Sequence, residues 1–239
     1  MYEHLSYKTS DELCEQMAQE CDTILLSFSC GKDSVASWLQ CRKYFKHIVP
    51  YYRYLVPDLE FVDDNLKYYE DFFGQHIYRF PSPNFYRMLR DGVFQSHARW
   101  IAIQTLTAYG EMPQSSYNEF VLAELIREVG NLPEGAYCAI GNRASDSPMR
   151  RMNISKNGCI NHNKKTFYPV YDWLQERLVR EITQAGVKLA TDYTLWNNTF
   201  DSMSYKYLSE MREHLPKDYE RCLTVFPMAQ LEFMRRGEE

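Results

Sequence analysis

Short apolar runs alternate with amphipathic stretches along most of the chain. Residues 22–29 (DTILLSFS) are an apolar run between a polar start and a glycine-containing loop, which is typical of a buried parallel strand. Residues 34–46 follow this loop and are predicted to form a helix. The same pattern predicts, in order, strand 47–56, helix 61–73, strand 76–80, helix 117–129, strand 136–140 and helix 172–185. Because strands alternate with helices, we expect an α/β fold with βαβ units and a mostly parallel sheet flanked by helices.

Two of the predicted helices have more specific signals. Thr9, Ser10 and Asp11 offer N-caps for a short N-terminal helix that ends near residue 20. The helix at 117–129 has an apolar side at helical spacing, which we expect to face the core. This side consists of Phe120, Leu122, Leu125, Ile126 and Val129.

Length and composition favour one domain. The chain has 239 residues, of which 45% are hydrophobic and 15% aromatic, so it can form a large core and is not disordered. No linker, internal repeat or low-complexity tract divides it. We predict an N-terminal helix over 1–21, the α/β domain over 22–199, and a helical C-terminal extension of the same domain over 200–239.

Charge and targeting signals narrow the class of protein. The 27 basic and 32 acidic residues give a formal net charge of -5, which argues against a protein whose whole surface binds nucleic acid or membrane. A local basic patch remains compatible with this charge. The sequence has no run of about 18 apolar residues, so no membrane span is predicted. The polar N-terminus is not a secretory signal.

Cysteine usage gives a prediction for the compartment. The seven cysteines form no CxxC pair, so they indicate neither a disulfide framework nor a zinc site. Reduced thiols in the cytoplasm are the simplest interpretation.

A loop of small residues joins the first predicted strand to the next helix. Its sequence, SFSCGKDSV, places helix N-terminal amides and the positive end of the helix dipole beside a glycine. Ser29 and Ser34 add hydroxyl donors, and Lys32 adds a full positive charge. The loop is not a Walker A motif, because it lacks the glycine pattern of that motif. It nevertheless predicts a cradle for a phosphate or sulfate. The predicted cradle comprises Ser27, Ser29, Cys30, Gly31, Lys32, Asp33 and Ser34.

A second polar string, GNRASDSPMR, follows the strand predicted at 136–140. Gly141 permits a close backbone approach, and Arg143 is expected to project into the crevice, where a guanidinium can bind phosphate in bidentate fashion. Asp146 would orient Arg143 or Arg150 by pairing with it, or lie near a magnesium ion. Ligands of parallel sheets bind beyond the carboxyl ends of the strands. We therefore expect both strings at one site, with Ser147 among the binding residues.

The two strings carry a family resemblance. SFSCGKDS is similar to the SGGKDS loop of the PP-loop adenine nucleotide alpha-hydrolases, and most similar to that of the phosphoadenylyl-sulfate (PAPS) reductase family. GNRASDSPMR resembles that family's G-x-R-x-x-E-S-x-x-R segment, with Asp146 in place of Glu. In YPVYDW, which resembles the family's YPI-x-DW, Asp172 would cap the next helix and Trp173 would pack at its start. Cys30 stands where glycine is usual, and a cysteine disfavours a strongly positive φ.

The resemblance covers about residues 22–227 and implies a Rossmann-like domain of the adenine nucleotide alpha-hydrolase type. It implies binding of ATP or PAPS, with magnesium held by Asp33 and Asp146. ATP would be cleaved at the α-phosphate, an acceptor would be adenylated and pyrophosphate would be released. Lys32, Arg143 and Arg150 would be the catalytic residues.

Other functions stay open. A true PAPS reductase would produce sulfite, but the family's C-terminal Glu-Cys-Gly-Leu-His segment is missing, and Cys222 is interpreted as a core residue. The cysteine pairs that bind a cluster in some reductases are also missing, so we expect no iron–sulfur cluster. A non-catalytic nucleotide-binding module and a component of nucleic-acid sulfur modification are further alternatives.

Residues 150–165 (RRMNISKNGCINHNKK) hold five cations and no acid. Their asparagines, serine and glycine predict a flexible loop. It would be a solvated loop, close over a polyphosphate, or contact a nucleic acid or partner protein. Cys159 in this positive field would favour the thiolate and is the candidate reactive cysteine. A homodimer also remains open.

Overall fold

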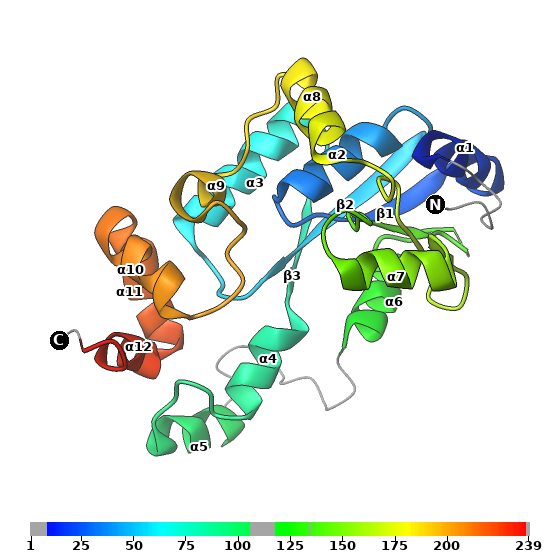
Figure 1. Cartoon of the computed structure of the whole chain (residues 1–239). Helices are drawn as coiled ribbons and strands as arrows, with labels where there is room; N and C mark the ends of the chain where they lie inside the picture. The colour runs from blue at the N-terminus through cyan, green and yellow to red at the C-terminus, as the bar shows by residue number, and fades with distance from the viewer. Residues whose placement is uncertain (1–8, 106–117, 134, 238–239) are drawn as a thin grey trace. The chain divides into compact units, whose positions relative to one another are not determined.

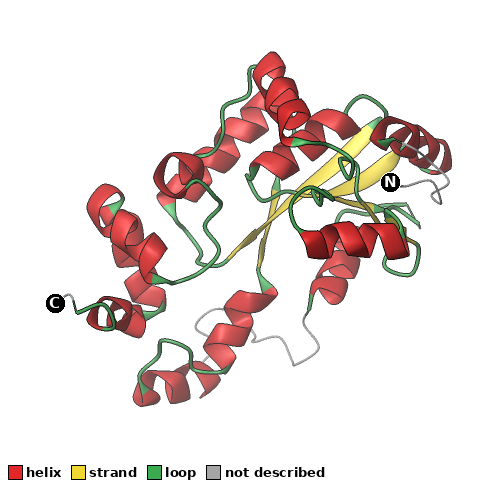
Figure 2. Cartoon of the chain, in the orientation of Figure 1, coloured by secondary structure: helices red, strands yellow, loops and turns green. Residues whose placement is uncertain are grey.

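The computed structural model describes residues 9–105, 118–133 and 135–237. In this part of the chain the strands are β1 (Thr23–Ser27), β2 (His47–Tyr54), β3 (Tyr78–Pro81), β4 (Cys138–Ile140), β5 (Ile160–Asn161) and β6 (Thr166–Phe167). They form one sheet in the order β3-β2-β1-β4-β6-β5 (Figures 1 and 2). β1 is parallel to β2 and β4, β4 is parallel to β6, and β5 is antiparallel to β6. The predicted α/β fold with a mostly parallel sheet is confirmed.

The helices account for most of the remaining described chain. They are α1 (Ser10–Glu20), α2 (Lys32–Cys41), α3 (Glu60–Phe73), α4 (Pro83–Arg90), α5 (His97–Thr105), α6 (Glu119–Val129), α7 (Pro148–Asn157), α8 (Gln175–Ala185), α9 (Thr191–Trp196), α10 (Tyr205–His214), α11 (Pro216–Val225) and α12 (Leu231–Met234), with a 3₁₀ turn at Pro227–Gln230. Every strand and helix that the sequence predicts is present, with shifted bounds. The pattern missed α4, α5, α7, α9 and the short pair β5 and β6.

The chain divides into two compact units. The first unit comprises Met1–Tyr52, Glu70–Tyr78 and Ala123–Leu189, and the second comprises Arg53–Tyr69, Arg79–Leu122 and Ala190–Glu239. The domain boundaries that we expect after residues 21 and 199 stay predictions. None of the described helices combines the length and apolarity needed to span a membrane.

The core of the first unit is built around β1. Ile24, Leu25 and Leu26 are fully buried, which explains why this strand is apolar at successive positions rather than at alternate ones. Leu25 lies opposite Cys138 of β4 in the parallel ladder. α2 packs against β1, β4, α1 and α8, and Figure 1 shows α2 and α8 side by side. The buried strand and its helix thus hold the loop between them in a fixed position.

β1 lies where the chain order of the sheet reverses. Its neighbours are β2, which follows it through α2, and β4, which comes much later in the chain. In the ladder, Ser27 at the end of β1 lies opposite Ile140 at the end of β4. The loops that leave these two parallel strands therefore start side by side at the same edge of the sheet. Such switch points form the ligand crevices of open α/β sheets.

The segment before α8 stabilises α1. Asp172 Oδ2 accepts the Ser10 N–H at 3.2 Å, and the indole N–H of the fully buried Trp173 donates to Ser10 Oγ at 2.9 Å. Leu174 is the N-cap of α8 and makes no side-chain cap. The prediction that Asp172 caps the following helix is wrong, because its carboxylate is used at the start of α1. Thr9 is the N-cap of α1, as predicted.

The apolar side of α6 is narrower than predicted. Leu122 and Ile126, one turn apart, are buried. Leu125 and Val129 are 38% and 61% exposed, because they lie on the next row around the helix. The side chain of Phe120 lies outside the described part.

Two buried carboxylates organise the second unit. Asp218 accepts the N–H groups of Glu60 and Phe61 at 2.5 and 3.3 Å, so it caps the start of α3. Asp192 accepts the Asn65 side-chain amide at 3.1 Å. Burial is the main cause that raises the pKa of both carboxyls above the usual range. These side chains hold helices that are distant in sequence to one another within this unit.

We predict that Leu25→Ala lowers the free energy of unfolding by about 3 kcal/mol, because it leaves a cavity beneath the central strand. The matched control is Leu174→Ala, since Leu174 is 61% exposed in the same unit. We expect this control to change stability by less than about 0.5 kcal/mol. Urea unfolding followed by circular dichroism measures both. Equal effects of the two substitutions would contradict the assignment of Leu25 to the core.

Candidate functional site

Hydrogen bonds within the loop after β1 set its shape. Ser34 Oγ accepts the Ser29 N–H at 3.2 Å and donates to the Gly31 carbonyl at 2.8 Å. Ser29 Oγ accepts the Gly31 N–H at 3.3 Å and lies 3.3 Å from Ser34 Oγ. The two hydroxyls predicted as anion donors thus hold the loop against the first turn of α2. Hydroxyl groups can rotate, so they can also turn toward a ligand.

The first turn of α2 begins without a side-chain cap. Gly31 is the N-cap in an extended conformation, and it has no side chain to bond the amides of the first turn. These amides and the positive end of the helix dipole are the groups that bind oxyanions in such loops. The start of α2 at Lys32, two residues earlier than predicted, puts Lys32 itself in this first turn.

Cys30 adopts a conformation that the sequence did not suggest. Its φ is +59°, in the left-handed region, although we expected a cysteine to disfavour a positive φ. This conformation costs a residue with a Cβ roughly 1–2 kcal/mol. The side chain is 3% exposed, so burial and the hydrogen bonds of the loop hold Cys30 in place. The loop therefore keeps the backbone path that a glycine would follow.

Gly141 brings the second predicted string against the first. A Cβ added to Gly141 would lie 2.8 Å from the carbonyl carbon and oxygen of Asp33 and 3.0 Å from the Ser34 nitrogen. Contacts under 3.0 Å from a Cβ to backbone atoms are essentially never seen. The end of β4 can thus contact the start of α2 only with glycine at this position. The prediction that Gly141 permits a close backbone approach is confirmed.

Ion pairs link the two strings in a row of alternating charge. Lys32 Nζ lies 2.9 Å from Asp33 Oδ2, and Asp33 Oδ1 lies 2.7 Å from Arg143 Nε. Arg143 Nη2 lies 2.7 Å from Asp146 Oδ1, and Arg150 pairs with the other oxygen of Asp146. The prediction that Asp146 orients an arginine is therefore confirmed, and it pairs with both. We call these five side chains the charge ladder.

Arg143 is the buried centre of the charge ladder. Its side chain is 4% exposed and also donates to Ser145 Oγ, the Trp173 carbonyl and Gln175 Oε1 at 3.3–3.4 Å. The expectation that Arg143 projects into the crevice is wrong, because its guanidinium is enclosed by two carboxylates and these neutral acceptors. Ser145 and Gln175 are contacts that no sequence signal identified. Lys32 and Arg150 remain partly exposed, at 28% and 47%.

Ser147 is placed by the same string but bonds locally. It is the N-cap of α7, and its Oγ accepts the Arg150 N–H at 3.2 Å. α7 replaces the first half of the flexible loop that we predicted over 150–165. The cap and Pro148 in the first turn explain why a helix starts here.

Asp33 and Asp146 do not fit a metal site as they are arranged. Both oxygens of Asp33 face Lys32 and Arg143, and both oxygens of Asp146 face Arg143 and Arg150. A hard cation would have to compete with these positive groups for the same oxygens. Over the described ranges, no group of three or more His, Cys, Asp and Glu side chains is placed to hold a metal ion. We therefore assign neither carboxylate to magnesium.

Cys159 is not a reactive thiol. Its side chain is fully buried, and burial raises the pKa of the thiol well above the usual range. The expectation that the neighbouring cations favour the Cys159 thiolate is wrong, because those cations lie at the surface while Cys159 is buried in the interior. Cys222 is also fully buried, and burial raises the pKa of its thiol to about 12, so its interpretation as a core residue is confirmed.

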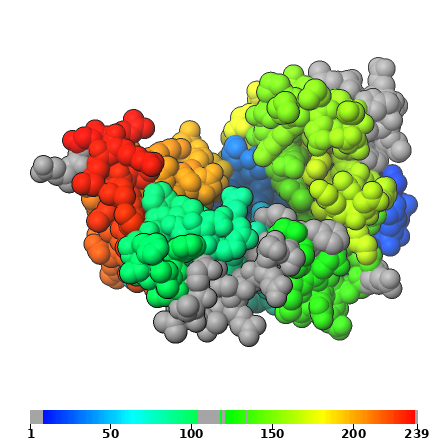
Figure 3. Space-filling view, turned by 90° about the horizontal axis from the view of Figure 1, so that it is seen from below, coloured from blue at the N-terminus to red at the C-terminus, as the bar shows by residue number. Residues whose placement is uncertain are grey.

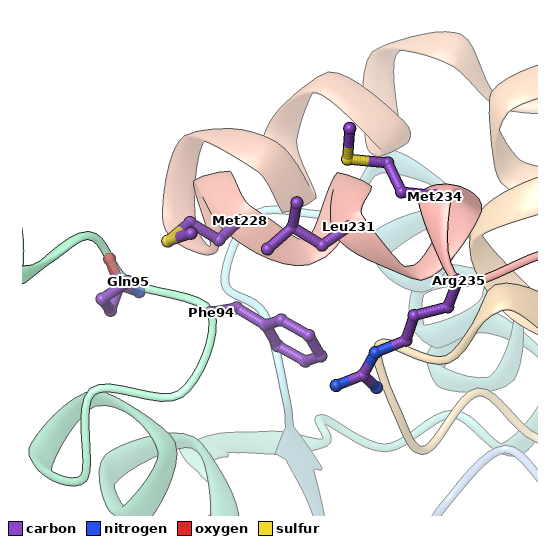
Figure 4. A pocket seen from close by; sticks show the side chains of 6 residues that line it. All are labelled: Phe94, Gln95, Met228, Leu231, Met234 and Arg235. Carbon is purple, nitrogen blue, oxygen red and sulfur yellow. The ribbon is translucent and has the colours of Figure 1, made fainter. Parts of the chain in front are cut away.

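A cavity of about 470 Å³ lies in the second unit, between the segment before α5 and the C-terminal helices (Figure 4). It is lined by Phe94, Gln95, Met228, Leu231, Met234 and Arg235. Apart from Arg235 and the amide of Gln95, its lining is apolar. No sequence signal pointed to it, and it contains none of the predicted site residues.

Comparison with known proteins identifies similar folds. No protein-family model and no curated protein matches the chain. The NH3-dependent NAD synthetase from Campylobacter jejuni subsp. jejuni NCTC 11168, in complex with the nitrate ion, is 8% identical, with a TM-score of 0.47, over 95% of this chain and 93% of that chain. The U34-tRNA thiolase NcsA from Methanococcus maripaludis is 12% identical, with a TM-score of 0.44, over 92% of this chain and 79% of that chain.

These comparisons do not confirm the PAPS reductase-like family. At these identities the similarity concerns the fold alone. The thiolase carries a [4Fe-4S] cluster, so our exclusion of an iron–sulfur cluster on the basis of the family resemblance is corrected. The proposed function therefore assumes neither the presence nor the absence of magnesium or of an iron–sulfur cluster.

We predict that Gly141→Ala disrupts the contact between the two strings, because the added Cβ meets backbone atoms that cannot move independently. The substitution should lower the free energy of unfolding by about 1–3 kcal/mol, within the range of overpacked sites. Asn142→Ala at the next position is the matched control and should change stability by less than about 0.5 kcal/mol. Urea unfolding measures both. A Gly141→Ala protein as stable as the control would contradict the close contact.

The cysteine assignments predict a labelling order. At pH 8, iodoacetamide should modify the half-buried Cys21 of the folded protein and leave Cys159 and Cys222 unmodified, because burial excludes the reagent and raises the pKa of these two thiols. All three should react in denaturant. Peptide mapping by mass spectrometry measures the extent of each reaction. Modification of Cys159 as fast as Cys21 in the native protein would overturn its burial.

Proposed function

We propose that the first unit binds ATP by its phosphates and belongs to an enzyme that cleaves ATP at the α-phosphate. One observation carries the proposal: two polar strings from the ends of β1 and β4 meet at the switch point of the sheet, with Gly141 in contact with the start of α2. A loop with uncapped helix amides and a lysine in the first turn suits a polyphosphate more than an uncharged ligand.

The residues of the charge ladder would have different roles in this enzyme. The first-turn amides of α2 and Lys32 would hold the β- and γ-phosphates, which leave as pyrophosphate. Arg150, at the exposed end of the ladder, would reach an oxygen of the α-phosphate. Arg143 would act as a positioning residue, because it holds Asp33 and Asp146, the partners of Lys32 and Arg150. The sequence-based assignment of Arg143 to direct catalysis is changed accordingly.

The proposed reaction is an adenylyl transfer. A nucleophilic oxygen of the acceptor attacks the α-phosphorus and forms a new P–O bond, while the bond from the α-phosphorus to the oxygen that bridges to the β-phosphate breaks. Pyrophosphate leaves with the electron pair of that bond, and the proton of the acceptor passes to solvent. Negative charge grows on the leaving oxygen, and the amides of α2 and Lys32 would stabilise it.

The strict PAPS reductase reaction has less support. It needs a thiolate nucleophile in an accessible, positive environment. Cys30, the cysteine of the cradle, is 3% exposed, and Cys159 and Cys222 are fully buried. We therefore favour phosphate chemistry on ATP over reductive chemistry on PAPS.

Calorimetry with ATP, AMP, PAPS and pyrophosphate in parallel tests the proposal. We expect ATP and pyrophosphate to bind and AMP to bind much more weakly, because the cradle holds the β- and γ-phosphates. Lys32→Gln should weaken ATP and pyrophosphate at least about tenfold, which corresponds to about 1.4 kcal/mol. Asp33 stays paired with Arg143 in this variant, so the loop is expected to keep its shape.

The matched control is Lys46→Gln, an exposed lysine paired only loosely with Asp22 at 3.5 Å in the same unit. It should bind both ligands with wild-type affinity. Equal affinity for AMP and ATP, or a Lys32→Gln protein that binds ATP as tightly as the control, would refute the proposal.

A further inference from the structure

A long stretch of the chain without Asp or Glu begins beside the charge ladder. From Ser147 to Tyr171 the chain has no Asp or Glu but five cations, although its formal net charge is -5. The structure folds this stretch into α7 and the antiparallel pair of β5 and β6, in the first unit. The pair lies at the edge of the sheet, because β5 is its last strand.

The cations of this stretch lie at the surface. In α7, Ile154 is the buried residue, so most of the helix circumference faces outward. Arg151, Lys156 and Lys164 are exposed, and in the described part of the chain no carboxylate lies within ion-pair distance of them. Arg150, by contrast, belongs to the charge ladder. We call Arg151, Lys156, Lys164 and the exposed asparagines between them the basic surface.

The asparagines distinguish this surface from a general positive patch. Asn153 and Asn157 of α7, Asn161 of β5 and Asn163 of the following turn are exposed and lie between Arg151 and Lys164 in the sequence. Asn157 and Asn153 bond to each other at 2.6 Å along α7. Their amides add uncharged hydrogen-bond donors to the positive charges. Contacts to nucleic-acid backbones combine these two groups, cationic side chains and amide donors.

We propose that the basic surface binds the phosphate backbone of a nucleic acid. Arg151 and Lys156 are five residues apart, which separates them by about 7.5 Å along the axis of α7 and by about 140° around it. Lys164 adds a cation from the turn between β5 and β6. Cations spread along a helix and an adjacent hairpin fit a chain of phosphates better than one compact anion. Figure 3 shows lime and yellow-green surface, the colours of residues in this range, in view on the face drawn.

An anionic membrane is the main competing partner, and the surface suits it less. An interfacial helix needs an apolar face of large side chains that enters the lipid. The exposed apolar residues of α7 are Met149 and Met152, and the rest of its outward positions are polar or charged. Four exposed asparagines would have to lose water at a lipid boundary. The same groups keep their hydrogen bonds on a phosphate backbone.

Fluorescence anisotropy with labelled 20-mer single-stranded RNA, single-stranded DNA and duplex DNA tests the proposal at several salt concentrations. Each phosphate neutralised contributes roughly −0.7 to −0.9 to the slope of log affinity against log salt. We expect wild-type binding to weaken steeply with salt. The triple variant Arg151→Gln, Lys156→Gln, Lys164→Gln should bind at least about tenfold more weakly in low salt and flatten the slope by about 2.

The matched control removes the same charge elsewhere, by Lys46→Gln, Arg180→Gln and Arg236→Gln at exposed positions. It should bind nucleic acid within about twofold of wild type. Equal losses in both triple variants, or absence of salt-dependent binding in the wild type, would overturn the proposal. So would tighter binding to vesicles of 30% phosphatidylserine than to any nucleic acid. Comparison of the affinities for RNA and for DNA decides which of the two is the partner.

The test is independent of the ATP proposal. Arg150 and the loop after β1 are untouched in the basic-surface variant, so its affinity for ATP by calorimetry should equal that of the wild type. Loss of nucleic-acid binding with retained ATP binding would separate the two sites. Circular dichroism checks that α7 stays folded in each variant.

Discussion

The candidate site depends on a close backbone contact that only a glycine can make. Gly141 lies directly against the backbone of Asp33 and Ser34, at a distance that no residue with a Cβ could keep. This contact joins the end of β4 to the first turn of α2 and so fixes two loops that are more than a hundred residues apart in the chain. The ion pairs between the loops follow from it, because they need both backbones in this register.

The charged side chains of the two joined loops are arranged in a row of alternating sign. Three cations and two carboxylates alternate from Lys32 to Arg150, and the most buried member, Arg143, has a carboxylate on each side. A buried guanidinium without such partners would cost several kcal/mol. Asp33 and Asp146 therefore compensate the burial of Arg143. Asp146 also pairs with Arg150, which lies at the surface.

The sequence predicted the parts of the structure that have a local or periodic cause. The apolar run of β1, the N-cap at Thr9 and the place of the two polar strings at strand ends follow from local chemistry. Arg143 was misplaced, because its burial involves Asp33 and Gln175, which only tertiary structure brings to it. The reactivity of Cys159 was predicted wrongly for a related reason. The charge of the neighbouring sequence does not determine whether one thiol is buried or exposed.

The charge ladder has a consequence for the energetics of ligand exchange. If Lys32 turned from Asp33 toward an incoming anion, as the proposed function requires, Asp33 would not become an isolated charge, because its other oxygen faces Arg143. The same would hold for Asp146 if Arg150 moved away. Each end of the charge ladder could therefore exchange one counterion for another, while the buried centre at Arg143 kept both of its carboxylates.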